Sequence, residues 1–562
     1  MITQEAMIPV EWLPRSVETL RNYDRQTFLS DSIAGLTVGL VALPLAMAFA
    51  ISSGMPPQSG IYCAVVTGFI ISALGGSKTQ IGGPTGAFVV VVSGIVTKYG
   101  VDGLFLCTAM AGVILLLLGI TGMGTAVKFI PRPVVIGFTN GIALLIASTQ
   151  VKDFFGIAVE KVPGEFIDRV RVLLLHAGTA SLSATLLGIG ALAVVLLTPR
   201  FFKRIPGQIA ALFLGTAVSV AFGLSVATIG SRFGGIPSGL PTIHIPVFRP
   251  ELMLTLLSPA LTVAMLGAIE SLLSAVVSDR LSGDTHKPNV ELVAQGIANI
   301  VSPMFGGLPA TGAIARTATN IRSGGKTPVA GIIHALTLLA VLLFAAPLAK
   351  FIPLPVLSAI LFVVAWNMGE WKEVPALLRL SKTDRSVWLI TFVLTVIADL
   401  TVAVEVGMVL AALLYIGRVS ATTTVSEVTA DYVRGNRIHI LQDKVIPYYL
   451  AMFRIHGPFL FGATDKLTMV TERVNELPEI IVLRLRNMTA IDATGLEAIE
   501  DLAKKVRAAN RELILCGARE QPAALMMQAH MDRHVGKNNI CSSVDSALDR
   551  AAQLHQQRQG TV

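Results

Sequence analysis

The chain has 562 residues, of which 53% are hydrophobic and only 14% are charged, and its formal net charge is +8. Soluble globular domains carry about 25% charged residues, so the composition excludes an ordinary soluble protein and predicts one that crosses a membrane several times. In such a protein the positive charge reflects Lys and Arg kept on the cytoplasmic side, and we expect no binding of nucleic acid.

Residues 1–30 contain acidic side chains but no apolar stretch before a cleavage site, so we expect a cytoplasmic N-terminal segment rather than a signal peptide. Residues 31–420 form the predicted transmembrane domain, because apolar segments of about the length of a membrane-spanning helix follow one another there. We expect fourteen of them, at 32–51, 58–75, 84–97, 102–121, 131–150, 172–199, 207–224, 253–277, 289–305, 311–321, 327–348, 353–368, 386–398 and 401–417.

Basic residues gather in alternate connections between these segments, for example at 200–204, 322–326 and 372–385. That asymmetry predicts an even number of crossings with both termini in the cytoplasm. The four cysteines, Cys63, Cys107, Cys516 and Cys541, lack the spacing of disulfide frameworks or zinc sites. We therefore expect neither a metal site nor a cofactor.

Two interruptions break the apolar sequence in a similar way, "GGPTGAF" at 82–88 and "GGLPATGAI" at 306–314. The segments that follow are too short to span a bilayer, since about 13 helical residues cover only about 20 Å. Each is expected to begin near the middle of the membrane after Thr-Gly-Ala, where a helix N-terminus attracts anions. The alternative is that each Gly-Gly-Pro combination marks an ordinary loop turn.

The two interrupted segments occupy matching places, because each is the third in a set of seven. An odd number of spans per repeat inverts one half relative to the other, so the two short helices are expected to meet head to head. Interrupted segments at corresponding positions of two halves indicate the binding site of a transporter.

Two charged residues accompany the second break. Arg316 is expected about one turn into the second short helix, and Glu270 lies in the otherwise uncharged stretch "LTVAMLGAIESLLSAVV". Buried charges inside a membrane are expensive and indicate function. Arg316 could hold a mobile anion or form a salt bridge with Glu270. Glu270 could carry a coupled proton or serve as a fixed counter-ion.

After residue 420 the composition becomes that of a soluble protein. We expect a linker at 421–436 and an α/β domain at 437–562, with strands in "RIHILQDKVIPYYLAMFRIHG", "EIIVLRLRN" and "ELILCGA" and a helix in "DATGLEAIEDLAKKVRAANR". Such a domain regulates more often than it catalyses. It shows no nucleophile–base pair or phosphate loop, so no catalytic residue and no enzyme activity is expected.

The stretches "DSIAGLTVGLVALPLAMAFAISSGMPPQSGIY", "IGGPTGAF", "AMLGAIESLLSAVVSDRLSGDTHKPNVELVAQGIANIVSPMFGG" and "RSGGKTP" resemble the SulP (sulfate permease) family of anion transporters. "MTAIDATGLEAI" resembles the signature turn of a STAS domain. The resemblance implies an all-α polytopic fold of 7+7 inverted segments, like that of uracil permeases. A core domain (segments 1–4 and 8–11) would move against a gate domain (5–7 and 12–14), in a homodimer whose STAS domain regulates or docks a cytoplasmic protein.

The resemblance also implies an anion site between the third and tenth segments, lined by the first and eighth. Its residues would be Leu45, Phe49, Thr85, Gly86, Ala315 and Arg316, with Glu270 as the coupling acid. Sodium-coupled bicarbonate members carry an Asp and a Thr in the eighth segment and lack the arginine, so Arg316 and Glu270 argue against sodium coupling. In the STAS turn Ala493 replaces the serine that related proteins phosphorylate, which argues against a phosphorylation switch at that position and leaves Thr494 as the alternative.

The expected function is secondary active transport of an anion across the cell inner membrane. "AMLGAIES", "GAIARTATNIR" and "VVAWNMGE" look most like bacterial members that carry C4-dicarboxylates such as succinate and fumarate. Proton-coupled dicarboxylate or sulfate uptake is therefore expected, and sodium-coupled bicarbonate symport or anion exchange is the alternative. A nucleobase permease would place a carboxylate where Arg316 stands. A channel or voltage-driven motor of the same fold would show conductance without coupling.

Overall fold

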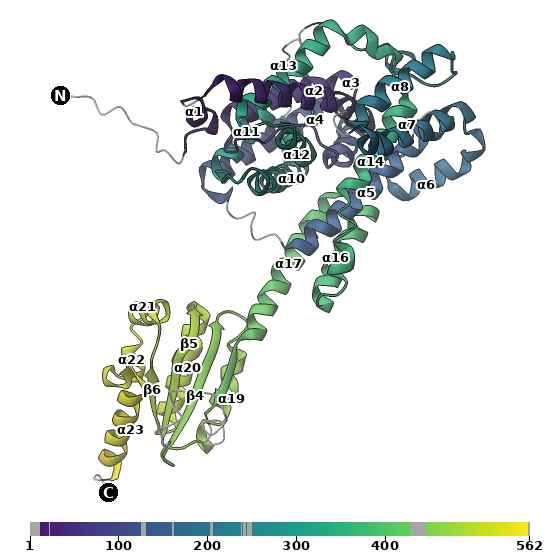
Figure 1. Ribbon diagram of the computed structural model, residues 1–562. Helices are drawn as coiled ribbons and strands as arrows, with labels where there is room; N and C mark the ends of the chain where they lie inside the picture. Colours follow the sequence, from purple (N-terminus) through teal and green to yellow (C-terminus); the bar gives the residue numbers. More distant parts are fainter. Residues whose placement is uncertain are drawn as a thin grey trace, which may run out of the picture. The chain divides into compact units, whose positions relative to one another are not determined.

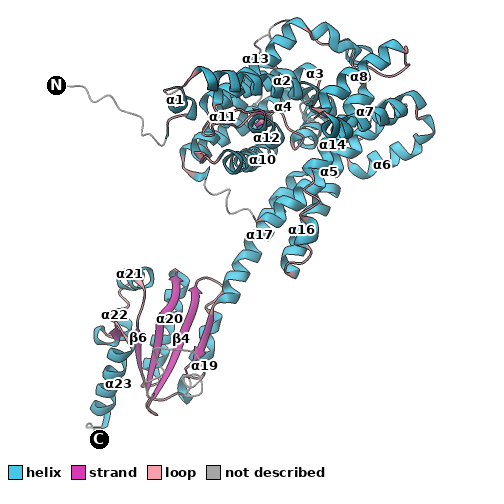
Figure 2. Ribbon diagram, viewed as in Figure 1, coloured by secondary structure: helices cyan, strands magenta, loops and turns pink. Residues whose placement is uncertain are grey.

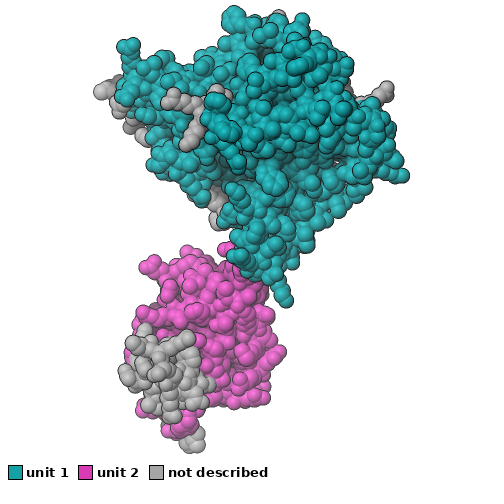
Figure 3. Space-filling view, turned by 45° about the vertical axis from the view of Figure 1, so that its right-hand side comes forward, with its two compact units in different colours: residues 1–409 teal, residues 410–562 magenta. Residues whose placement is uncertain are grey.

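The computed structural model describes residues 12–21, 23–124, 131–159, 162–202, 206–237, 239, 243, 250–398, 400–428 and 446–559. The chain divides into two compact units, Met1–Val409 and Leu410–Val562, which are coloured separately in Figure 3. The first unit consists of helices and one two-stranded sheet, and the second contains a five-stranded sheet (Figure 2). Each unit is described by itself.

The helices that begin in the first unit follow the predicted apolar segments in order along the chain (Figure 1). They are α1 (Arg15–Leu20), α2 (Arg25–Ser52), α3 (Pro57–Leu74), α4 (Phe88–Ile120), α5 (Arg132–Phe155), α6 (Phe166–Leu175), α7 (Leu182–Phe201), α8 (Gly207–Ala221), α9 (Ile229–Phe233), α10 (Pro250–Ser282), α11 (Pro288–Val301), α12 (Ile314–Arg322), α13 (Pro328–Phe344), α14 (Leu354–Met368), α15 (Val374–Leu377), α16 (Lys382–Ile397) and α17 (Leu400–Thr422).

Every predicted apolar segment overlaps a helix, but one boundary differs. Segments 84–97 and 102–121 correspond to two helical stretches of α4, which a kink separates at Gly100, where φ is +74°. The prediction of one continuous segment over 172–199 is wrong, because α6 ends at Leu175 and a separate helix, α7, begins at Leu182. Among the described residues, six helices are long and apolar enough to span a membrane by length and composition. The number of crossings stays a prediction.

The helices of this unit pack in two groups. In the first, α2, α3, α4, α10, α11, α12 and α13 contact one another, and in the second α5, α7, α8, α14 and α16 do so. The first group matches the expected core, segments 1–4 and 8–11, and the second matches segments 5–7, 12 and 13 of the expected gate. The two groups are called the core and the gate. Glycines permit close helix packing in the core, since a Cβ on Gly296 of α11 would lie 2.6 Å from the backbone nitrogen of Leu116 of α4.

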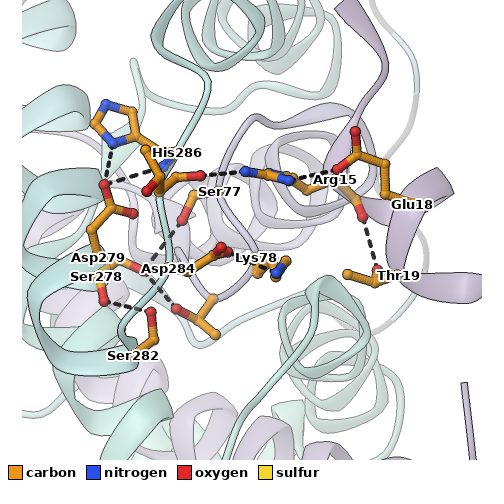
Figure 4. A network of polar contacts seen from close by, with 12 residues as sticks. Arg15, Glu18, Thr19, Ser77, Lys78, Ser278, Asp279, Ser282, Asp284 and His286 are labelled. Atoms are coloured by element: carbon orange, nitrogen blue, oxygen red, sulfur yellow. Dashed lines mark hydrogen bonds and ion pairs between the residues drawn. The ribbon is translucent and has the colours of Figure 1, made fainter. Parts of the chain in front are cut away.

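The N-terminal helix α1 is attached to the core by polar contacts around the loop that follows α10 (Figure 4). Glu18 forms ion pairs with Arg15 at 2.6 Å and with Lys287 at 2.5 Å. Arg15 also donates to the carbonyl of Thr285. In the same loop, His286 pairs with Asp279 at 2.6 Å. The lead-in segment therefore belongs to the core rather than to the gate.

The second unit is a three-layer α/β domain. Its sheet has the order β3-β4-β5-β6-β7, and β3 pairs antiparallel with β4 while the other pairs are parallel. The elements are β3 (Thr424–Glu427), β4 (Leu450–Phe459), α19 (Asp465–Glu472), β5 (Ile480–Ile491), α20 (Ala493–Ala508), β6 (Glu512–Cys516), α21 (Glu520–Gln528), α22 (Asp532–Val535), β7 (Ile540–Cys541) and α23 (Val544–Gln559).

Alternating side chains along β5 explain the layers. Ile481 and Leu483 pack with α19 and α20 on one face, whereas Ile480 and Val482 pack with α23 on the other. The three predicted strand stretches overlap β4, β5 and β6, although residues 437–445 of the first lie outside the described residues. Strand β3 falls inside the range expected as a linker, so that stretch contributes to the sheet.

Candidate functional site

The two sequence interruptions face each other in the structure. Gly82–Gly83 form strand β1 and Thr311–Gly312 form strand β2, and the two pair antiparallel with Gly82 opposite Gly312. Figure 2 shows this short sheet among the helices near α12. The prediction that the two breaks meet is confirmed, and their reading as independent loop turns is excluded.

Both short helices begin directly after Thr-Gly-Ala, α4 at Phe88 and α12 at Ile314, as the sequence predicted. The strands differ, because β1 lies ahead of Thr85 in the first half whereas β2 consists of Thr311 and Gly312 in the second. The short helix α12 has nine residues and covers about 13 Å. It therefore begins inside the bundle, with its first N–H groups lacking partners within the helix.

A polar stripe on α11 stabilises this non-helical backbone. Glu291, Gln295 and Asn299 follow one another at four-residue spacing, so they share one face of the helix. The Glu291 carboxylate accepts from the backbone nitrogen of Gly76 at 2.9 Å and from Gln80 Nε2 at 3.1 Å. Asn299 bonds both the N–H and the C=O of Ala310. Irregular backbone at membrane depth needs such partners, and these replace water for both breaks.

Arg316 lies in the first turn of α12, two residues after its start, rather than a full turn into it as expected. Its side chain is 2% exposed, and Nη2 donates to the carbonyl of Pro84 at the other break. Nη1 is buried and has no hydrogen-bond partner. A guanidinium that keeps a buried N–H unsatisfied costs free energy, so this group is suited to a ligand that arrives from outside the chain.

Glu270 lies on α10 and accepts a hydrogen bond at 3.0 Å from the hydroxyl of Thr85. The structure has no ion pair between Glu270 and Arg316, so the predicted structural salt bridge is wrong for this conformation. Each side chain instead contacts the first break, Glu270 through Thr85 and Arg316 through Pro84. Glu270 and Arg316 therefore each form a hydrogen bond with the first break and none with each other.

A cavity of about 350 Å³ lies between core and gate beside these groups. All seven residues expected at the site line it, namely Leu45, Phe49, Thr85, Gly86, Glu270, Ala315 and Arg316. The core contributes α2, α10 and α12, and the gate contributes α5, α8, α14 and α16. The wall is mostly apolar, and Arg316 is the one Arg or Lys among the described residues that line it. The structure thus brings the predicted residues together at one place.

Sequence reasoning missed three carboxylates. Glu291, which is fully buried, supports the breaks, and its signal was the spacing of Glu291, Gln295 and Asn299 in an apolar segment. Glu370 lines the cavity from the turn after α14, and no sequence pattern marked it. Asp31 is also fully buried and accepts from the backbone nitrogens of Lys326 and Thr327 before α13.

Gly83 is essential to the position of Arg316. A Cβ at this residue would lie 2.4 Å from Arg316 Nη1, and its φ of +149° is strained for any side chain. We expect Gly83→Ala to insert normally but to lose transport by about tenfold or more, because displacing the guanidinium by about 1 Å misplaces the ligand. Anion uptake into proteoliposomes measures this loss. Gly94→Ala in α4, where an added Cβ meets nothing within 4 Å, should behave as wild type, and equal activity of the two variants would contradict the role of Gly83.

The fold and site define a class, a polytopic membrane transporter with a separate α/β domain and a cavity between two helix groups. A sequence profile of the sulfate permease family matches residues 28–391, and one of the STAS domain matches residues 442–547. The chain therefore belongs to the sulfate permease (SulP) family and carries a STAS domain, as the sequence motifs predicted. Its family consists of transporters, so it is not an enzyme.

Relatives and solved structures agree with this assignment. The chain is 40% identical over 522 residues to a Bacillus subtilis (strain 168) protein named "Putative sulfate transporter YvdB", covering 92% of this chain and 97% of that one. It is 30% identical to "Bicarbonate transporter BicA" of Picosynechococcus sp. over 93% of this chain and 94% of the relative.

Among solved structures, the transmembrane domain of a cyanobacterial bicarbonate transporter BicA matches with a TM-score of 0.62 at 34% identity, over 69% of this chain and 98% of that one. SLC26A9 matches with a TM-score of 0.83 at 17% identity, over 96% and 93%. The second match shows the fold alone. The relatives are named as sulfate or bicarbonate transporters. None of these names mentions a C4-dicarboxylate, the substrate that the short motifs suggested.

Proposed function

We propose that this protein is a proton-coupled anion transporter that takes up sulfate, with the anion held between the starts of α4 and α12. The observation that carries the proposal is the buried Arg316, whose Nη1 has no partner while its Nη2 is fixed to Pro84. The proposed contacts are Arg316, the backbone at Thr85, Gly86 and Ala315, and the apolar walls Leu45 and Phe49.

The charges around the site favour a dianion that moves with a proton. Arg316 contributes one positive charge, and the N-termini of two helices contribute about half a charge each. A dianion balances these charges if Glu270 is protonated, whereas a monoanion such as bicarbonate balances them if Glu270 is ionised. Proton coupling through Glu270 and sulfate as the substrate therefore belong together. A C4-dicarboxylate has the same charge and is the second substrate to test.

The proposed location is the cell inner membrane, with both termini in the cytoplasm as the basic residues indicate. In this orientation α12 and α14 both end on the cytoplasmic side, and the cavity lies toward that side. A homodimer and a cytoplasmic protein partner at the STAS domain complete the proposal as expectations from the family resemblance.

Uptake assays test substrate and coupling together. Purified protein in proteoliposomes is given labelled sulfate, succinate or bicarbonate, each with an inward proton gradient, an inward sodium gradient or none. We expect sulfate to accumulate only with the proton gradient. Succinate accumulation would retain the mechanism and change the substrate, and sodium-driven bicarbonate uptake would contradict both. An ionic current without accumulation of the anion, under any of these conditions, would identify a channel.

A further inference from the structure

Glu370 is presented to the cavity by a rigid turn of the gate. Its φ of +45° is rare for a residue other than glycine. The preceding carbonyl, of Gly369, accepts from Asn140 of α5, and Trp388 Nε1 of α16 donates to Asn140 Oδ1 at 2.8 Å. The turn is therefore tied to two gate helices and moves with them.

Three ionisable side chains line the cavity within the described residues. Arg316 and Glu270 come from the core, and Glu370 comes from the gate. Glu270 accepts from Thr85, whereas no hydrogen bond or ion pair to a described residue occupies the Glu370 carboxylate. That carboxylate is free to act on whatever enters the cavity.

The charges that act on Glu370 are Glu373, at the start of α15, and Arg132 of α5, which form an ion pair at 2.7 Å. Lys372 lies between Glu370 and Glu373 in the chain and is exposed. Partial burial and the neighbouring Glu373 raise the pKa of Glu370, and Arg132 opposes them. The carboxyl thus titrates nearer to neutral pH than an exposed glutamate does. Because Arg132 is paired with Glu373, it only partly compensates the charge of Glu370.

We propose that Glu370 is a charge gate that sets anion affinity on the side of the cavity where the gate turn lies, and this inference rests on the proposed anion transport. Ionised, the carboxylate repels the bound anion. Protonated, it permits binding. The gate moves against the core, so Glu370 meets the anion in one orientation only, whereas Glu270 remains beside the site throughout. In the proposed topology this side is cytoplasmic, so an ionised Glu370 promotes release into the cell and hinders rebinding.

The test is Glu370→Gln, with the apparent KM for labelled sulfate measured from the cytoplasmic side of oriented vesicles over a pH range that begins at the ordinary pKa of a glutamate, about 4.3, and ends at about pH 8, because burial and Glu373 raise the pKa of Glu370. For wild type we expect KM to rise about tenfold over this range, as expected for a unit charge acting on a dianion across a wet cavity. Glu370→Gln should show a clearly smaller rise, which is the part that deprotonation of Glu270 contributes. Glu370→Asp should restore the rise, and Glu165→Gln, an exposed carboxylate at the N-cap of α6, should leave it unchanged.

The outcomes separate the two proposals. If wild type transports sulfate and Glu370→Gln shows the same rise of KM as wild type, the charge gate is wrong and the proposed function stands. If wild type carries none of the tested anions, both the proposed function and the charge gate are wrong. A Glu370→Gln variant that loses uptake at every pH also overturns the gate, because removing a repulsive charge must not weaken binding.

Discussion

Replacing Arg316 with alanine is expected to reduce anion uptake about 100-fold while leaving the protein folded. A hydrogen bond to a charged group contributes about 1.5–3 kcal/mol, and Arg316 is the one Arg or Lys among the described residues lining the cavity. Without it, the two helix N-termini remain, but a dianion loses its main counter-charge. Initial rates of labelled sulfate uptake into proteoliposomes measure the effect.

Two further variants separate charge from geometry. Arg316→Lys keeps the charge but loses the planar fork that reaches Pro84, so we expect partial activity with a raised KM. Arg322→Ala, at the exposed end of the same helix, is the matched control and should transport as wild type. Because Arg316 also bridges the breaks, thermal unfolding in detergent must be compared. Wild-type uptake by a well-folded Arg316→Ala protein would place the anion site elsewhere.

The site could be predicted from the sequence because non-helical backbone inside a membrane costs free energy and therefore indicates function. Gly-Gly and Pro in an apolar chain have few explanations, so the inverted repeat predicted that the two breaks meet. It did not predict that 82–83 and 311–312 pair as strands. Both helices begin after Thr-Gly-Ala as predicted, but the strands use Gly-Gly in one half and Thr-Gly in the other. The similar sequences of the two breaks predicted where the breaks lie, but not which residues of each break pair as strands.

Side-chain partners could not be predicted from the sequence. Arg316 and Glu270 were plausible ion-pair partners as the two charges near the tenth and eighth segments, yet Pro84 and Thr85 between them each take one contact. Glu370 depends on a left-handed turn held by Asn140, which lies far from it in sequence. The polar stripe that includes Glu291 was visible as a spacing, but its purpose required knowing which backbone groups lacked partners.

Glu270→Gln is expected to abolish proton-driven accumulation while preserving exchange of sulfate across the membrane. Glutamine has nearly the same shape and can still accept from Thr85, so the anion site keeps its geometry. It carries no proton in either orientation, so the anion can no longer move together with one. With one proton per anion, a gradient of one pH unit supports at most about tenfold accumulation, since one pH unit is worth about 1.4 kcal/mol.

The measurement compares net accumulation with counterflow in the same vesicles. In wild type, sulfate should rise above equilibrium when the outside is acidic, and Glu251→Gln, an exposed carboxylate at the start of α10, should do the same. Glu270→Gln should only equilibrate, yet exchange labelled for unlabelled sulfate. If the variant still accumulates sulfate, the proton travels elsewhere and Glu270 is a fixed counter-ion. If it loses exchange as well, the carboxylate acts in holding the anion, and Thr85→Ala should then show the same loss.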